Sequence, residues 1–145
     1  MTKHGATFAL AVLLVSSLSG CFGGTPDDYH YSAEDAEGYT SDYTLDDPLF
    51  NLTLDDRGEV NMKISELVLV VKQDGVSHPC EAEGGGGNCT VTQHGGDNDA
   101  LWEMGETLTV TENGVNICGG TCILTFILEG PDGSRTTGPT VLTVN

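Results

Sequence analysis

The sequence predicts an all-β fold. Apolar and polar residues alternate with period two in several short segments, for example Phe50 to Leu54 and Thr107 to Glu112, and this alternation is typical of half-buried strands. Turn signals such as Asp74-Gly75 and Asn113-Gly114 recur about every ten residues, and no helical period persists. Short strands at this spacing favour two packed antiparallel sheets. We therefore expect an immunoglobulin-like β-sandwich of about seven or eight strands.

Each expected strand follows from a local pattern. The segments are 50–54, 60–64, 67–71, 90–93, 107–112, 123–129 and 140–144. The run from Leu67 to Val71 is apolar throughout, which is typical of a strand covered on both faces. Between Thr107 and Glu129 we expect a strand, an Asn-Gly turn and a hairpin closed by two cysteines.

The first 20 residues have the features of a leader. A basic start with Lys3 precedes an apolar run from Ala6 to Val15, which is too short to cross a bilayer, so this segment is expected to be a signal peptide. The motif Leu18-Ser19-Gly20-Cys21 resembles the lipobox of prokaryotic lipoproteins at every position. That resemblance implies lipid on the sulfur of Cys21, so that the chain is anchored to the membrane or cell surface and lies outside the cytoplasm. An ordinary signal peptide with an unrelated cysteine is the alternative.

Residues 21–48 differ in composition from the rest of the chain. They are rich in Gly, Ser, Thr, Asp and Glu, and they hold all four tyrosines of the protein. Few aliphatic side chains and dense acidic charge are typical of disordered segments. We therefore expect a flexible acidic stalk over 21–48 and a β-sandwich domain over 49–145, with the tyrosines solvated; a segment that docks on a partner is the alternative.

The charge balance excludes one class of partner. The 145 residues include 22 acidic and 5 basic ones, a net charge of −17, and removal of Lys3 with the leader makes it about −18. Nucleic-acid binding needs clustered Lys and Arg, so no nucleic-acid partner is expected.

Four cysteines remain after Cys21. An even number in a small exported domain predicts two disulfides, for which three pairings are possible. The order along the chain favours Cys80 with Cys89 and Cys118 with Cys122, each closing a glycine-rich loop. Neither gap resembles a zinc or Cys-x-x-Cys redox motif, so we expect no metal and no other cofactor.

Histidines and acidic residues offer further candidates. A zinc site from the thiolates with His78 and His94 is the metal alternative. His94 could also act as a ligand or base beside Asp97 and Asp99, but the glycines that follow it favour a simple turn. The acidic clusters Asp97-Asn98-Asp99 and Asp46-Asp47 could hold calcium only weakly, because the ligand spacing of a calcium loop is absent, so we expect both to be solvated surface.

Two sequons could carry glycan on an exported chain. They are Asn51-Leu52-Thr53 and Asn88-Cys89-Thr90. Asn51 lies in an expected strand, whereas Asn88 lies in a glycine-rich loop and is expected to be the more accessible of the two.

The segment His94-Gly95-Gly96-Asp97, followed by Trp102 and Gly105-Glu106-Thr107, resembles the globular β domains of archaeal type IV pilins. The resemblance covers residues 88–145 and implies a β-sandwich surface protein without enzymatic activity. Pilins assemble through a long N-terminal apolar helix, and this sequence has a lipobox in its place.

These features predict a surface lipoprotein that presents a small β-sandwich as a structural, adhesive or binding module. Its expected partners are membrane lipid through Cys21, and other cell-surface proteins or glycans. A substrate-capturing lipoprotein of a transport system is the alternative. No serine or cysteine nucleophile stands in a recognisable arrangement with a histidine and an acid, so we expect no catalytic residues and no enzyme.

Overall fold

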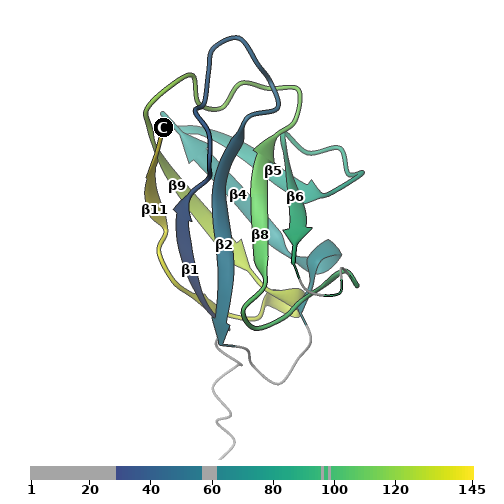
Figure 1. The fold of residues 1–145 in the computed structure, drawn as a ribbon. Helices are drawn as coiled ribbons and strands as arrows, with labels where there is room; N and C mark the ends of the chain where they lie inside the picture. The colour runs from purple at the N-terminus through teal and green to yellow at the C-terminus, as the bar shows by residue number, and fades with distance from the viewer. Residues whose placement is uncertain (1–28, 57–61, 96, 98) are drawn as a thin grey trace, which may run out of the picture.

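The all-β prediction is confirmed by a computed structural model that describes residues 29–56, 62–95, 97 and 99–145 (Figure 1). The strands are β1 Tyr29–Asp35, β2 Pro48–Asp56, β3 Met62–Lys63, β4 Val68–Gln73, β5 Val76–Ala82, β6 Cys89–His94, β7 Leu101–Trp102, β8 Thr107–Glu112, β9 Cys122–Glu129, β10 Thr136–Thr137 and β11 Val141–Val144. Two single-turn 3₁₀ helices, Ile64–Glu66 and Pro131–Gly133, interrupt them.

One long sheet makes up most of the domain. Its strand order is β10-β1-β2-β8-β6-β5-β4-β9-β11, and β3 pairs with β7 in a second, two-stranded sheet. The long sheet curls over on itself, so that β4 and β9 pass behind β1, β2 and β8 (Figure 1). The two halves of one sheet thus form the two layers of a sandwich-like fold, with one core between them.

Period-two alternation places the core side chains. In β8 and β9 every second residue is buried, because successive side chains of a strand point to opposite faces. Phe50 of β2 stacks on Phe126 of β9 across the two layers, with ring centroids 4.9 Å apart. The buried Trp102 donates its indole N–H to the carbonyl oxygen of Glu106 at 2.8 Å.

The turn predicted at Asp74-Gly75 is present and joins β4 to β5. Both residues have positive φ, 49° and 82°. This is the backbone of the two-residue turn that matches the twist of a hairpin, and Asp-Gly adopts it readily.

The predicted stalk is wrong from Tyr29 onward. Residues 29–35 form β1, which pairs with β2 over its length and with β10 at its start. Tyr29 is fully buried and Tyr31 is 4% exposed. Their large apolar area offsets the ordering of an otherwise polar segment, so the domain begins before residue 49. The rest of the stalk prediction, residues 21–28, lies outside the described residues.

Two strand predictions need correction. Of the strand expected over 60–64, Met62–Lys63 form β3 and Ile64 begins a 3₁₀ turn instead, while residues 60 and 61 lie outside the described residues. The strand near Leu67 runs from Val68 to Gln73 and is covered on one face only, since Val68 is 50% exposed. A strand within one curled sheet has its second face on the outside of the molecule.

The expected hairpin between 107 and 129 is also wrong. β8 lies between β2 and β6, whereas β9 lies between β4 and β11. The connection at 113–121 therefore crosses from one layer to the other and does not turn back on its own strand. Among the described residues, no helix has the length and hydropathy needed to cross a membrane.

Candidate functional site

Two loops meet at the end of the domain where β1 and β8 finish. We call residues 36–47 and 113–121 the distal loops. The N–H of Gly114 donates to the carbonyl of Leu45 at 2.9 Å, and the N–H of Glu112 donates to the carbonyl of Asp47 at 3.0 Å. These backbone bonds join segments about 70 residues apart in the chain into one surface.

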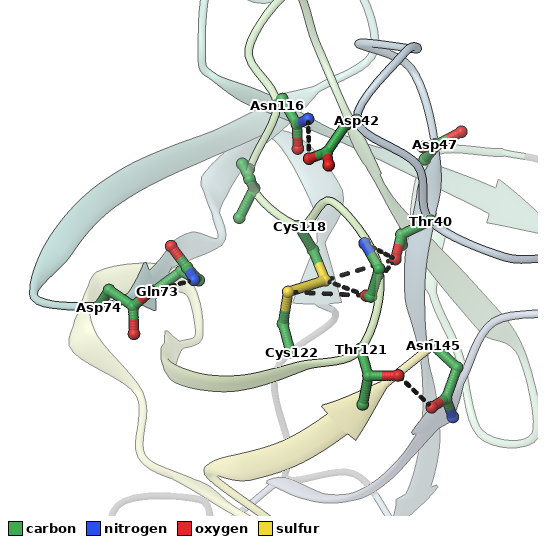
Figure 2. Close-up of a disulfide and its surroundings, with 12 residues drawn as sticks. Thr40, Asp42, Asp47, Gln73, Asp74, Asn116, Cys118, Thr121, Cys122 and Asn145 are labelled. Carbon is green, nitrogen blue, oxygen red and sulfur yellow. Dashed lines mark hydrogen bonds between the residues drawn. A yellow bond between two sulfur atoms is a disulfide. The ribbon is translucent and has the colours of Figure 1, made fainter.

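The Cys118–Cys122 disulfide anchors this surface (Figure 2). The hydroxyl of Thr40 donates to the carbonyl oxygen of Gly120 at 2.5 Å, and the N–H of Gly120 donates back to that hydroxyl at 3.1 Å. Thr40 is only 6% exposed. The disulfide loop is therefore held to the segment after β1 by a buried, reciprocal pair of hydrogen bonds.

Glu112 is a buried carboxyl group beneath the distal loops. Its side chain is 2% exposed, and its Oε1 accepts the N–H groups of Ile117 and Cys118 at 2.7 and 2.8 Å. Its Oε2 is buried without a hydrogen-bond partner. Burial raises the pKa of Glu112 above its usual value of 4.5, and the nearby negative charge of Asp47 adds to that effect. The group that shapes the loop is thus a carboxyl that loses its proton less readily than an exposed glutamate does.

Asp47 has the opposite environment. Its Oδ1 accepts the hydroxyl of Thr44 at 2.5 Å and its Oδ2 accepts the N–H of Ser41 at 2.6 Å. These hydrogen bonds hold the pKa of Asp47 below its usual value, and the bond from Thr44 has the largest effect. The lowered pKa favours the carboxylate form of Asp47, which orders the loop from 41 to 47 through these hydrogen bonds, whereas Asp46, the other residue of the calcium site considered from the sequence, is exposed.

A shallow hollow of about 470 Å³ opens beside the Cys118–Cys122 loop. Its lining includes the acidic side chains of Asp35 and Glu37 and the hydroxyl groups of Thr40 and Thr121, together with the exposed Tyr39. Its lining residues are Asp35, Glu37, Gly38, Tyr39, Thr40, Gly120, Thr121 and Asn145. An acidic, hydroxyl-rich hollow next to an aromatic ring suits a polar or cationic group better than an apolar ligand.

The second disulfide, Cys80–Cys89, lies at the same end of the domain. Asn113 joins it to the distal loops, because its N–H donates to Asn88 and its side-chain amide donates to Gly87, both at 2.9 Å. The structure therefore has the pairing that the order of the cysteines favours. With the sulfurs paired, the zinc site considered for these cysteines has no thiolates to use.

Removal of either disulfide should destabilise the domain. Loop closure predicts a loss of about 2 kcal/mol for Cys118→Ala/Cys122→Ala and slightly more for the longer Cys80–Cys89 loop. We expect the stability loss of Cys80→Ala/Cys89→Ala to exceed that of Cys118→Ala/Cys122→Ala by more than loop length alone predicts. The reason is that Cys80 and Cys89 are both buried, whereas Cys122 is partly exposed. Urea unfolding of the two double variants measures this. Equal losses, or a larger loss at Cys118–Cys122, would contradict it.

The two histidines singled out from the sequence lie apart. His78 is 6% exposed beside the Cys80–Cys89 disulfide, and its Nδ1 lies 3.3 Å from the amide nitrogen of Asn88. Burial lowers the pKa of His78, which favours the neutral imidazole over the charged one. His94 is exposed at the other end of β6, where it pairs with Thr107.

The turn predicted after His94 is consistent with the φ of +82° at Gly95. Beyond it, Asp97 approaches Glu103 and Glu106, with carboxylate oxygens within 4.8 Å of one another. Glu106 is 8% exposed, and its Oε2 accepts the side-chain amide of Gln93 and the N–H of Glu103, each at 2.8 Å. This is the one group of three such side chains in the described part of the chain that lie close enough to share a cation. Asp99 does not join it, because its side chain accepts the N–H of Leu101 at 2.9 Å.

The remaining predicted sites have mixed outcomes. Asn51 lies in β2, where its side chain accepts the hydroxyl of Thr109 at 2.7 Å. Asn88 is half-buried, as Asn51 is, so the greater accessibility expected for Asn88 stays a prediction. Cys21 and its lipobox lie outside the described residues. Glu112 and Thr40 were missed by sequence reasoning, although the alternation Leu108, Val110, Glu112 already places Glu112 on the inward face.

No protein-family model and no curated protein matches the chain.

Proposed function

We propose that this protein is a lipid-anchored, extracytoplasmic surface protein that presents its β domain as a structural, adhesive or binding module. The lipobox Leu18-Ser19-Gly20-Cys21 supports the anchor. The observation that carries the extracytoplasmic location is the pair of disulfides, Cys80–Cys89 and Cys118–Cys122, because such bonds persist in oxidising compartments.

The direction of β1 supports presentation of the distal loops. Lipid at Cys21 would be attached eight residues before Tyr29. From Tyr29, β1 leads to Asp35 and the distal loops at its far end (Figure 1), a rise of roughly 20 Å at about 3.3 Å per residue. An anchor at Cys21 therefore leaves the distal loops directed away from the membrane.

The surface of the distal loops fits a binding role. Tyr39 and Tyr43 are 86% and 96% exposed, and aromatic rings on ordered loops are common anchors for partners. The second candidate function is the capture of a small polar solute for a transport system, and the hollow beside Tyr39 supports it.

The anchor is tested with the variant Cys21→Ser. We expect the wild-type chain to sediment with membranes and to carry lipid on its N-terminal peptide by mass spectrometry, whereas Cys21→Ser loses the lipid and leaves the membrane fraction. The Cys118→Ala/Cys122→Ala variant is the control, since it removes two sulfurs and should stay on the membrane. An unmodified Cys21 in a soluble wild-type chain would refute the anchor.

Presentation is tested on intact cells with a protease that cleaves after tyrosine. Cleavage at Tyr39 or Tyr43 in the wild type, and its loss in Tyr39→Ser/Tyr43→Ser, would place the distal loops outside the cell. Protection of the wild type until cells are broken would argue against surface exposure. A thermal shift with small cationic or polar solutes would favour the capture role instead.

A further inference from the structure

The outer face of β4, β9 and β11 carries a group of aliphatic side chains. They point outward from adjacent strands and alternate with buried core residues, and Thr125 and Thr143 lie among them on the same face. We call Val68, Val70, Ile123, Ile127 and Val141 the apolar face. Ile123 is 67% exposed, Val141 55%, Val68 50% and Ile127 47%.

An exposed apolar face is unusual for the outside of an antiparallel sheet, which normally carries polar residues toward water. The other layer of this domain follows the rule, because the outward residues of β8 and β6 include Thr107, Thr109, Thr90 and Thr92. Contiguous apolar patches on a soluble surface mark contact sites. A partner with an apolar surface should therefore cover β4 and β9.

Two opposite charges border the centre of this face. Val70 pairs with Ile127 in the register of β4 and β9. On one side of that row Lys72 pairs with Thr125, and on the other side Val68 pairs with Glu129. Lys72 and Glu129 are both exposed, and neither takes part in the ion pair of Lys63 with Glu66. The centre is therefore neutral, with a free cation at one end and a free anion at the other.

This charge pattern is complementary to itself. We propose that a second copy of the chain docks on the apolar face, related by a two-fold axis that runs across the strands along the row of Val70 and Ile127. That rotation reverses the strand direction, so Lys72 of each copy comes over the Val68–Glu129 row of the other, one strand away from Glu129 and within reach of its side chain. An axis parallel to the strands would instead bring like charges together, which selects the first arrangement.

The other apolar surface available to an anchored protein is the membrane, and the charge of the chain argues against it. The net charge of −17 is repelled by the negative potential of anionic lipid surfaces. A second copy is equally acidic overall, but it supplies both an apolar surface and the opposite charge at each required position. The proposal does not depend on lipid at Cys21, so the outcome at Cys21 leaves it unaffected.

The charge pairing is tested by reversal. The full chain is purified in mild detergent, and its mass is followed by light scattering over a dilution series. Lys72→Glu and Glu129→Lys should each raise the dissociation constant of the dimer about tenfold or more, and the double variant should return to within about threefold of wild type. Lys63→Glu and Glu66→Lys make the same changes of charge off this face and should leave the constant within about threefold.

The apolar contact is tested by Ile127→Asp, which should make the chain monomeric over the same dilution series. Thr109→Asp adds the same charge to the outer face of β8 and is the matched control, expected to remain dimeric. A wild-type chain that is monomeric at all concentrations overturns the proposal. A dimer that survives Ile127→Asp, or a double charge reversal that restores nothing, overturns it as well.

Discussion

Tyr31→Ala is expected to lower the free energy of unfolding by about 3 kcal/mol or more, the usual cost of deleting a buried aromatic side chain. Tyr31 is 4% exposed, and its ring lies 6.3 Å from that of Phe126, measured between centroids. Its hydroxyl donates to the carbonyl oxygen of Pro139 at 2.7 Å. The side chain thus joins β1 to the opposite layer and to the segment before β11.

Gly138 makes this site difficult to repack. A Cβ at Gly138 would lie 2.4 Å from the backbone oxygen of Tyr31 and 2.7 Å from its ring. The backbone therefore lies directly on the tyrosine, and a smaller side chain leaves a cavity that the surroundings fill poorly. Tyr31→Phe keeps the ring and loses only the hydrogen bond, so it should cost about 1 kcal/mol.

Urea unfolding followed by circular dichroism measures both changes. Tyr43→Ala is the matched control, because Tyr43 is 96% exposed and its removal should change the free energy of unfolding by less than about 0.5 kcal/mol. If Tyr31→Ala proved as harmless as Tyr43→Ala, β1 would not belong to the cooperative domain, and the stalk predicted from the sequence would be restored.

Tyr29 and Tyr31 lie in the segment for which the predicted stalk was wrong. The segment around Tyr29 and Tyr31 is acidic and has few aliphatic residues, so its composition is that of a disordered chain. The composition of this segment gives no information about the strands that pair with it. β1 is ordered because β2 and β10 pair with it on its two sides, and that pairing joins residues up to about 100 positions apart. Local patterns cannot supply such contacts.

The strands predicted correctly from the sequence are those with strong alternation of apolar and polar residues, such as β8 and β9. Their inward residues, among them Leu108 and Phe126, are buried as expected. The same pattern could not say that these two strands lie in different layers. Asn113-Gly114 is a signal for a hairpin, but the N–H of Asn113 donates to Asn88 and that of Gly114 donates to Leu45. The turn is used to cross the end of the domain.

The candidate site was predicted only where it depends on residues that are close in the sequence. The spacing of the cysteines is local, so the order along the chain was enough to favour the pairing that the structure has. The meeting of both disulfides with the distal loops depends on the fold. Glu112 was visible as an inward residue, but its acceptance of the N–H groups of Ile117 and Cys118 is specified by the path of the crossing.

Glu112 provides the second large effect. Glu112→Ala should lower the free energy of unfolding by about 2 to 3 kcal/mol, because the buried N–H groups of Ile117 and Cys118 lose their acceptor. Glu112→Gln keeps an oxygen for both N–H groups and should cost far less. If the alanine and glutamine variants were equally unstable, the carboxyl oxygen would not be what holds residues 113–121.

The glutamine variant also isolates the effect of pH. The pKa of Glu112 is raised in the folded protein, so the neutral acid stabilises the fold below the unfolded value of about 4.5, and that stabilisation is lost as the pH rises through the folded value. Glutamine cannot ionise. The free energy of unfolding of Glu112→Gln should therefore increase relative to wild type between pH 4 and pH 7, measured by urea unfolding at each pH.

The difference in unfolding free energy between variant and wild type cancels most of the titration of the other acidic groups. One of these is Asp47, whose lowered pKa gives a contribution of the opposite sign that is lost as the pH falls. A difference that stays constant between pH 4 and pH 7 would mean that Glu112 ionises in the folded protein as readily as in water, and that its burial beneath the distal loops carries no electrostatic cost.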